Sequence, residues 1–260
     1  MLRLKRQAEP SYERAPDHPW SSAPAGMVVY AVGDIHGRAD LLEALLDKIT
    51  ADRARRPDLD AALVFLGDYV DRGPESDRVL DLVLGVDRTL FEVRTLKGNH
   101  ESALLAFLED PASGAGWMRF GGVETLAAYG VKAPRLARDA DGWKAAAEAL
   151  LDRMPVEHMQ LLQSLELSAV YGDYFFAHAG ARPGTELEAQ ADDDLLWIRD
   201  EFLQDPRAFD KVVVHGHTPE KRVWSDGRRI GVDTGAYATG VLSAVRLQDR
   251  RRDLLTASSA

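Results

Sequence analysis

Residues 27–37 read Met-Val-Val-Tyr-Ala-Val-Gly-Asp-Ile-His-Gly, and this stretch decides the fold class of the 260-residue chain. Its first six residues form a continuous apolar run of the length expected for a buried strand. The run ends in polar residues between glycines, and side chains alternate along an extended backbone, so Asp34 and His36 lie on the same side. The stretch therefore predicts a buried strand that delivers a carboxylate and an imidazole to one site.

The same arrangement returns four times along the chain. Each time an apolar run ends in a residue that can bind a metal ion, and in most cases a glycine is adjacent to that residue. The later junctions are Gly67-Asp68, Gly98-Asn99-His100-Glu101, His178-Ala179-Gly180 and His215-Gly216-His217. Helical periods separate the first three strands, and this β-α-β-α order predicts an α/β fold. Ligand-binding loops gather at the carboxyl ends of such strands, so the five junctions are expected to meet.

The rest of the chain is organised around this pattern. Residues 1–26 hold four prolines and many charges without an apolar period, which indicates a flexible arm. Residues 27–250 form one expected domain, of a size that a single core supports. Within it, the Gly-rich and then Ala-rich residues 110–153 predict a helical cap. The Arg-rich, Ser-ending residues 251–260 are expected to be a tail.

Composition narrows the possible partners. Asp and Glu number 42 against 32 Lys and Arg, which gives a net charge of −10 and disfavours nucleic acid and anionic lipid. The chain has no cysteine, so thiolate metal sites and a cysteinyl-phosphate route are excluded. No apolar run approaches the roughly 18 residues of a membrane-spanning helix. A cytoplasmic monomer without nucleic-acid or membrane partners is the expectation.

Each junction alone is weak evidence for a metal site. A Gly-Asp pair after a strand is usually a turn, and a single buried histidine is more often a hydrogen-bonded core group. Five junctions in one chain are far more specific and predict a metal centre. A mixture of imidazole and carboxylate ligands suits first-row divalent ions better than Ca²⁺. Asp68 can bridge two such ions if it lies opposite Asp34.

The five junctions together resemble those of the PPP-type metallophosphoesterases, which are the protein serine/threonine phosphatases and their bacterial and phage relatives. Residues 33–37, 67–73 and 98–101 match the three signatures of that family in order, and residues 178–180 and 215–218 resemble its two later histidine motifs. The resemblance runs from about Val28 to Leu247. It implies the calcineurin-like metallophosphoesterase fold, a central β-sandwich of mixed sheets flanked by helices.

The resemblance also implies the ligands of two divalent ions, with Asp68 as the bridge between them. The first ion would be held by Asp34, His36, Asp68 and His217. The second would be held by Asp68, Asn99, His178 and His215. A pair of Mn²⁺ ions is expected, with Fe or Zn as alternatives.

Two further residues would move a proton. His100 resembles the general acid of the family, which protonates the leaving alkoxide. Asp71 would hold the tautomer of His100 and raise its pKa. The alternative for Asp71 is a cap on the following helix.

Two arginines are expected to bind the substrate phosphate. The planar guanidinium of Arg72 matches two phosphoryl oxygens, and the alternative is a surface salt bridge. Arg199 resembles the second phosphate arginine of bacterial and phage members. Its surroundings, residues 195–202, are also compatible with an amphipathic helix that places Trp197 and Phe202 in the core.

The function expected from these residues is hydrolysis of a phosphomonoester, by direct in-line attack of a hydroxide that bridges the two ions. The first substrate class is phosphoproteins, as in a protein serine/threonine phosphatase, because Asp71, Glu101 and Thr218 follow the usage of those enzymes. A symmetrical dinucleoside tetraphosphatase, or another phosphatase of small phosphoesters on the same scaffold, is the alternative. A non-catalytic metal-binding module would be expected to lose His100, Arg72 or a ligand, and all of them are present.

Overall fold

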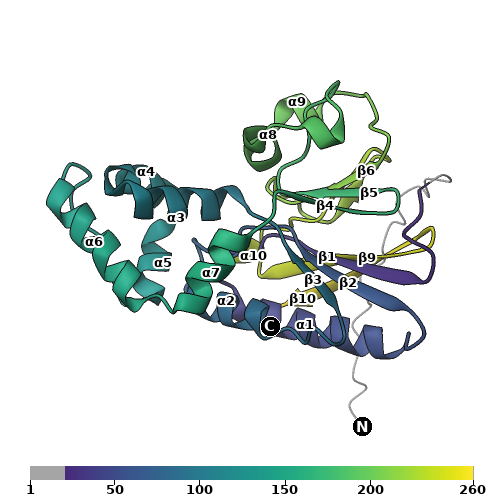
Figure 1. Ribbon diagram of the computed structural model, residues 1–260, viewed down its shortest axis with the longest axis horizontal. Coiled ribbons are helices and arrows are strands. Elements are labelled where there is room, and N and C mark those ends of the chain that lie inside the picture. Colours follow the sequence, from purple (N-terminus) through teal and green to yellow (C-terminus); the bar gives the residue numbers. More distant parts are fainter. Residues whose placement is uncertain (1–20, 260) are drawn as a thin grey trace, which may run out of the picture.

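Two five-stranded sheets form the centre of the computed structural model, which describes residues 21–259 (Figure 1). The strand orders are β10-β9-β1-β2-β3 and β4-β5-β6-β8-β7. The strands are β1 Met27–Val32, β2 Asp60–Phe65, β3 Glu92–Thr95, β4 Ser168–Tyr171, β5 Tyr174–Ala177, β6 Val212–His215, β7 Trp224–Ser225, β8 Arg229–Gly231, β9 Val241–Gln248 and β10 Arg251–Ser258. The expected α/β fold with a sandwich of sheets is confirmed.

Helices flank the sandwich on both outer faces. The α-helices are α1 Ala39–Ala54, α2 Ser76–Leu84, α3 Asn99–Glu109, α4 Gly114–Trp117, α5 Gly122–Ala128, α6 Ala140–Arg153, α7 Val156–Ser164, α8 Asp192–Trp197, α9 Asp200–Leu203 and α10 Ala236–Thr239. Short 3-10 helices are η1 Pro111–Ser113, η2 Met118–Phe120 and η3 Leu187–Ala189. Between residues 21 and 259, every helix is too short or too polar to cross a bilayer.

Both sheets are mixed, and their parallel strands determine where the site lies. In the first sheet β1, β2 and β3 are parallel, while β9 and β10 run antiparallel beside β1. In the second, β5, β6 and β8 are parallel, with β4 and β7 antiparallel at the two edges. The loops that follow the six parallel strands meet at one end of the sandwich, as expected for carboxyl ends of parallel strands.

Alternation along the strands explains the layers. In β1, Val28 and Tyr30 pack against the helices on the outer face, whereas Val29 and Ala31 face the second sheet. The second sheet repeats the pattern, because Phe176 points between the sheets and Phe175 points outward towards α8 and α9. The central strands β1, β2, β5 and β6 bury both faces, and this accounts for their continuous apolar runs in the sequence.

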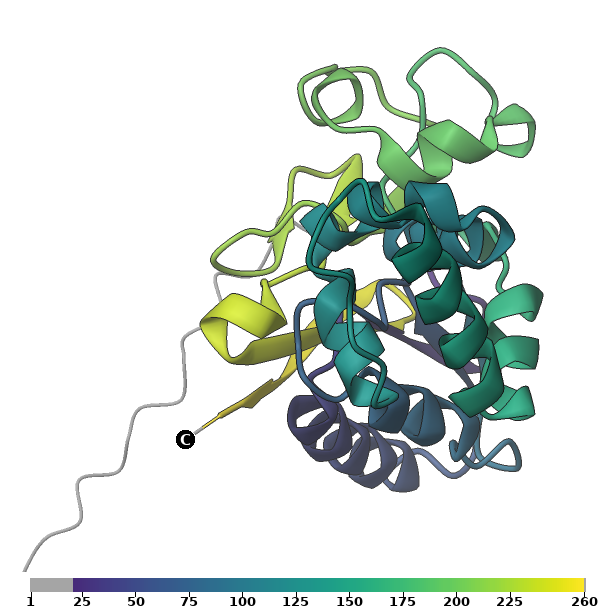
Figure 2. The same ribbon diagram turned by 90° about the vertical axis from the view of Figure 1, so that its left-hand side faces the viewer.

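The segment expected to be a helical cap is helical. Residues 110–153 contain η1, α4, η2, α5 and α6, and these elements extend with α3 and α7 beyond one end of the sandwich (Figure 1). Seen from that end, the cap helices lie between α1 below and the α8–α9 segment above (Figure 2). The cap therefore stands beside the ends of the strands and does not cover a sheet face.

Two boundaries differ from the expected ones. The arm expected over 1–26 lies largely outside the described residues, but Ser22 and Ala23 hydrogen-bond to Asp173 and Asp249 and so belong to the packed domain. The expected tail is strand β10, which pairs along the whole of β9. Leu255 and Ala257 of β10 pack on the helical side of the sheet, and this burial stabilises the strand despite its charged start.

Candidate metal centre and active site

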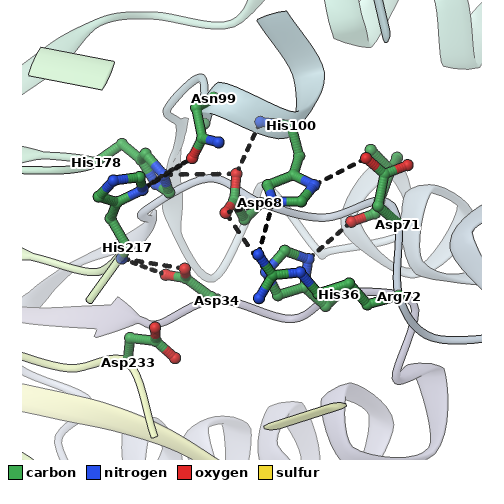
Figure 3. A network of polar contacts seen from close by, with 12 residues as sticks. Asp34, His36, Asp68, Asp71, Arg72, Asn99, His100, His178, His217 and Asp233 are labelled. Atoms are coloured by element: carbon green, nitrogen blue, oxygen red, sulfur yellow. Dashed lines mark hydrogen bonds and ion pairs between the residues drawn. The ribbon is translucent and has the colours of Figure 1, made fainter. Parts of the chain in front are cut away.

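Polar side chains from six strand ends converge on one site (Figure 3). The contributions are Asp34 and His36 after β1, Asp68, Asp71 and Arg72 after β2, Asn99 and His100 after β3, His178 after β5, His217 after β6 and Asp233 after β8. Except for Arg72, all of these side chains are buried. Such a concentration of buried ionisable groups is costly and marks a functional centre.

The backbone of these loops is strained at the same residues. Within residues 21–259, six non-glycine residues have a positive φ. Five of them belong to the site: His36, Asp68, Asp71, Arg72 and His217. Left-handed conformations are unfavourable for residues with a side chain and persist where the surrounding structure enforces them. Here they turn side chains from consecutive positions towards a common point.

His178, Asn99 and His217 form the first group of possible ligands. The Nδ1 atom of His178 donates to the carbonyl of Leu66 at 2.9 Å, so its Nε2 carries a lone pair. That lone pair lies 2.9 Å from Asn99 Oδ1 and 3.1 Å from His217 Nδ1. Asp68 Oδ1 is 3.5 Å away from the same nitrogen. Four potential donors of electron pairs therefore point at one another.

His36 and Asp68 begin the second group. The Nδ1 atom of His36 donates to the carbonyl of Val70 at 2.9 Å, and its Nε2 then faces Asp68 Oδ2 at 3.4 Å. The carboxylate of Asp34 lies on the other side, where it accepts the backbone N–H of His217 at 3.0 and 3.1 Å. Asp68 thus contacts both groups, which is the position expected of a bridging ligand.

The arrangement fits divalent cations. Burial lowers the pKa of His178 to about 3 and that of His217 to about 2, so both rings are neutral. Burial raises the pKa of Asp68 and Asp34 well above the ordinary value, which shows that their charge lacks compensation. Facing lone pairs and uncompensated carboxylates repel each other unless a cation lies between them. In addition, Nε2 of His217 is buried without a hydrogen-bond partner.

His215 is not brought into this group, contrary to the expected ligand set. Alternation along β6 turns it to the outer face with Val213, where its ring lies 5.1 Å from that of Phe202. Its Nε2 accepts from Arg229 at 3.0 Å and its Nδ1 lies 3.0 Å from the carbonyl of Gly216. His217, expected at the first ion, instead lies beside Asn99 and His178. His217 therefore lies where His215 was expected, and His215 lies outside the group of possible ligands.

His100 and Asp71 form a buried pair beside the ligands. The Nδ1 atom of His100 lies 2.8 Å from Asp71 Oδ2, and this contact fixes the tautomer that leaves Nε2 facing the site. Asp71 also accepts from Trp117 at 2.8 Å and from Thr125 at 2.6 Å. The alternative role of Asp71 as a helix cap is not observed, because Glu75 occupies the N-cap of α2.

The pKa of His100 departs from the expectation. Burial lowers it to about 4, helped by the charge of Arg72, and burial raises the pKa of Asp71 to about 7. The expected rise from the Asp71 carboxylate is therefore outweighed by the loss of water around both groups. In the protein without bound ions, the pair holds a neutral imidazole.

Of the two arginines expected to bind phosphate, Arg72 contacts the site. Arg72 donates to His100 Nε2 at 3.2 Å, and its guanidinium lies 4.6 Å from the centre of the Tyr237 ring. The charge of Arg199, an exposed residue, contributes to lowering the pKa of His100 and His217. The helix expected around Arg199 is broken there into α8 and α9. Trp197 is 36% exposed and not in the core.

Comparison with known proteins decides the family. The sequence profile of the calcineurin-like phosphoesterases matches residues 27–250.

This chain belongs to the calcineurin-like phosphoesterase family. It is 28% identical to an asymmetrical bis(5'-nucleosyl)-tetraphosphatase of Geobacillus thermodenitrificans, over 85% of this chain and 90% of that protein. It is also 28% identical to serine/threonine-protein phosphatase 2 of Escherichia coli, over 85% of this chain and 93% of that protein. Among solved structures, a putative diadenosine tetraphosphatase matches 92% of this chain and 100% of its own, with a TM-score of 0.61 and 21% identity. The resemblance seen in the sequence is confirmed, and the chain is a metallophosphoesterase hydrolase.

Glu101 holds together the loops of this calcineurin-like phosphoesterase. Its carboxylate accepts backbone N–H groups of Asp68, Tyr69, Val70 and Gly98 at 2.8 to 3.2 Å, and the side chain is fully buried. The carboxylate thus fixes the strained turn that carries Asp68 against the start of α3. This role is structural and differs from that of the neighbouring His100.

Replacing Glu101 with Gln should destabilise the protein by roughly 2–4 kcal/mol. An amide retains one oxygen but turns an NH₂ group towards N–H donors, which leaves buried donors unsatisfied. Urea unfolding of the protein without metal measures the change. Glu109→Gln is the matched control at the exposed end of the same helix, with an expected change within about 0.5 kcal/mol. Equal stability of the two variants would refute the role of the four hydrogen bonds.

Several site residues were not anticipated from the sequence. Asp233 lies beside Asp34 (Figure 3), and burial raises its pKa to about 6. Its signal in the sequence was weak, because residues 231–235 read Gly-Val-Asp-Thr-Gly but follow Arg228-Arg229-Ile230 and not an apolar run. Trp117 and Thr125 belong to residues 117–130, which resemble rim segments of the bacterial members of the family, whereas Tyr237 in α10 had no comparable signal. Their contacts with the site depend on the packing of distant segments.

Proposed function

We propose that this protein hydrolyses phosphomonoesters at a pair of divalent ions, with phosphoproteins as its substrates. The observation that carries the proposal is the position of the His100–Asp71 pair. It stands next to Arg72 and within 3.8 Å of Asp68, so a proton donor and a phosphate-binding group adjoin the ligands. A protein that only binds metal has no use for this combination.

The ligand sets follow the geometry. Asp34, His36 and Asp68 would hold one ion, and Asp68, Asn99, His178 and His217 the other. Bound first-row divalent ions, with Mn²⁺ as our first choice, supply positive charge and a hydroxide for in-line attack on phosphorus.

The residues around the ions orient the substrate and move its proton. Arg72 and Arg199 would bind the non-bridging oxygens of the phosphate. Arg72 contacts His100, and the charge of Arg199 contributes to lowering the pKa of His100 and His217. In the doubly protonated ring of His100, Nε2 would donate its proton to the oxygen of the leaving alcohol, and the ring would become the neutral imidazole. Asp71 keeps the proton of His100 on Nδ1 when the ring is neutral, and so holds Nε2 towards the substrate.

Hydrolysis of dinucleoside tetraphosphates is the second candidate. The observation in its favour is the likeness to the Geobacillus tetraphosphatase, which equals in identity and extent the likeness to the Escherichia phosphatase. The residues that bind phosphate and metal are the same in both proposals, and the choice between them depends on the mouth of the site.

The test is a comparison of substrates with the Mn²⁺-loaded protein. Phosphate release from phosphopeptides that stops on adding EDTA would support the first candidate. Activity confined to diadenosine tetraphosphate would replace it with the second. Bound metal without activity on either would leave a metal-binding module. Trapping of a phosphoenzyme would contradict direct attack.

Replacing Arg199 with Ala should lower kcat/KM for phosphoesters roughly 10- to 100-fold, because a hydrogen bond to a charged group contributes about 1.5–3 kcal/mol. Metal content, measured by mass spectrometry after dialysis, should be unchanged. Arg207→Ala, a substitution of an exposed arginine paired with Asp205, is the control and should leave kcat/KM intact. Unchanged kinetics of the Arg199 variant would remove this residue from the site.

A further inference from the structure

Aromatic rings surround the ligands in a nearly continuous series. Tyr237 contacts His36 at 5.3 Å between ring centres, His36 contacts His100 at 4.5 Å, and His100 contacts Phe120 at 5.8 Å. The series continues from Phe120 to Trp197 at 5.8 Å, and from Trp197 to His217 at 6.4 Å. These separations lie in the range of favourable contacts between rings. The histidines are buried, whereas the other three rings reach solvent.

Phe120, Trp197 and Tyr237 therefore form the mouth of the site, and we call them the aromatic rim. Their exposed fractions are 37%, 36% and 39%. They come from three segments that are distant in the sequence, η2 in the cap, the end of α8, and α10. Large aromatic side chains left half-exposed around a polar centre are typical of a binding surface.

The position of the rim relative to His100 indicates what it would bind. In the proposed reaction Nε2 of His100 lies at the oxygen that joins phosphorus to the leaving group. The atoms attached to this oxygen must then pass Phe120, which contacts the His100 ring directly. A ring bonded to that oxygen would lie against Phe120, whose own ring contacts that of Trp197. A nucleobase is separated from its phosphate by a ribose, and the methylene of a seryl ester presents little surface for stacking.

We propose that the aromatic rim selects aryl phosphates, such as a phosphotyrosyl side chain, over alkyl phosphates. The proposal rests on the phosphomonoesterase function and differs from the serine/threonine phosphatase expected from the sequence. The sequence motifs that match the family contain the residues expected to bind phosphate and metal, whereas Phe120 and Trp197 lie outside these motifs. Phe120 and Trp197 are specificity residues in this view, and Tyr237 holds Arg72 through its ring face.

Kinetics on two peptides of one sequence test the proposal. The Mn²⁺-loaded protein should hydrolyse the phosphotyrosyl peptide with a kcat/KM about tenfold or more above that of the phosphoseryl peptide. Phe120→Leu and Trp197→Leu keep an apolar side chain but remove the ring face, and each should reduce this ratio several-fold. Leu151→Ala, which changes an exposed apolar residue on α6, should leave the ratio unchanged.

Binding of two non-hydrolysable ligands provides a second measurement. Benzylphosphonate and ethylphosphonate carry the same charged group, and both have a methylene in place of the ester oxygen. Benzylphosphonate should bind about tenfold more tightly, and Trp197→Leu should abolish most of the difference. Hydrolysis of both peptides at equal rates, with equal affinity for both phosphonates, would overturn the rim proposal and leave the phosphomonoesterase intact. Absence of hydrolysis of either peptide, with metal bound, would overturn both.

Discussion

Replacing Asp68 with Asn is expected to remove both metal ions and to lower kcat at least 1,000-fold. Asp68 lies 3.4 Å from His36 Nε2 and 3.5 Å from His178 Nε2, so it belongs to both groups of potential ligands. An amide is a weaker ligand than a carboxylate and carries no charge to hold two cations. The loss of metal removes several kcal/mol of charge stabilisation in the transition state, and this accounts for the size of the effect.

Metal content and kcat measured on the same preparation check this result. Asp58→Asn makes the same chemical change at an exposed position and should retain both ions. Burial raises the pKa of Asp68 in the protein without metal, so neutralising this group should not reduce the stability of that form. An Asp68→Asn variant that binds no metal but is as stable as the metal-free parent protein would show that the substitution removes the metal site and leaves the fold intact. Retention of two ions per chain with near-normal kcat would contradict the bridging role.

His100→Asn is expected to reduce kcat for alkyl phosphates about 10²- to 10⁴-fold, the usual contribution of general acid catalysis. The loss should be much smaller for aryl phosphates. A phenolate is the less basic leaving group, with a pKa of about 10 for the parent phenol, and needs less help from a proton donor. The measurement is kcat for a series of esters with leaving groups of different basicity.

Metal content distinguishes the possible roles of His100. The residue lies near His36 and Asp68, in a geometry that could bind an ion, but its Nδ1 is occupied by Asp71 and its Nε2 contacts Arg72. If His100 donates a proton, the variant keeps its ions. Loss of an ion would assign it as a ligand instead, and an equal reduction of kcat for all leaving groups would exclude proton donation.

Most of the framework was predictable because strand signals are local. The strand expected at 174–177 is found with those bounds, since it is apolar and buries both faces. The strand expected near 91–96 is the shorter Glu92–Thr95, whose side chains are mostly polar and only partly buried. Strand β10 was missed because its first residues, Arg251-Arg252-Asp253, are charged. Its apolar positions become informative only when β9 provides a partner.

The site was predictable in its members but less so in their arrangement. His215 is the last residue of β6 and His217 follows it by two residues, and the expected ligand sets assigned the two to different ions. Alternation turns His215 outward, while a positive φ at His217 returns that ring to the ligands. The contacts of Trp117 with Asp71 and of Phe120 with His100 depend on how the cap docks. Such contacts join segments distant in sequence and leave no local pattern.

The left-handed residues of the site also constrain how this protein can evolve. Each of the five holds a side chain in a backbone conformation that costs of order 1 kcal/mol, and glycine would relieve that cost. Selection for thermal robustness alone would therefore favour replacing the residues on which hydrolysis depends. Variants whose thermal stability increases through substitutions at these five positions should be inactive. Directed evolution for heat resistance in this scaffold should therefore keep the five codons fixed and vary the cap and the outer helices.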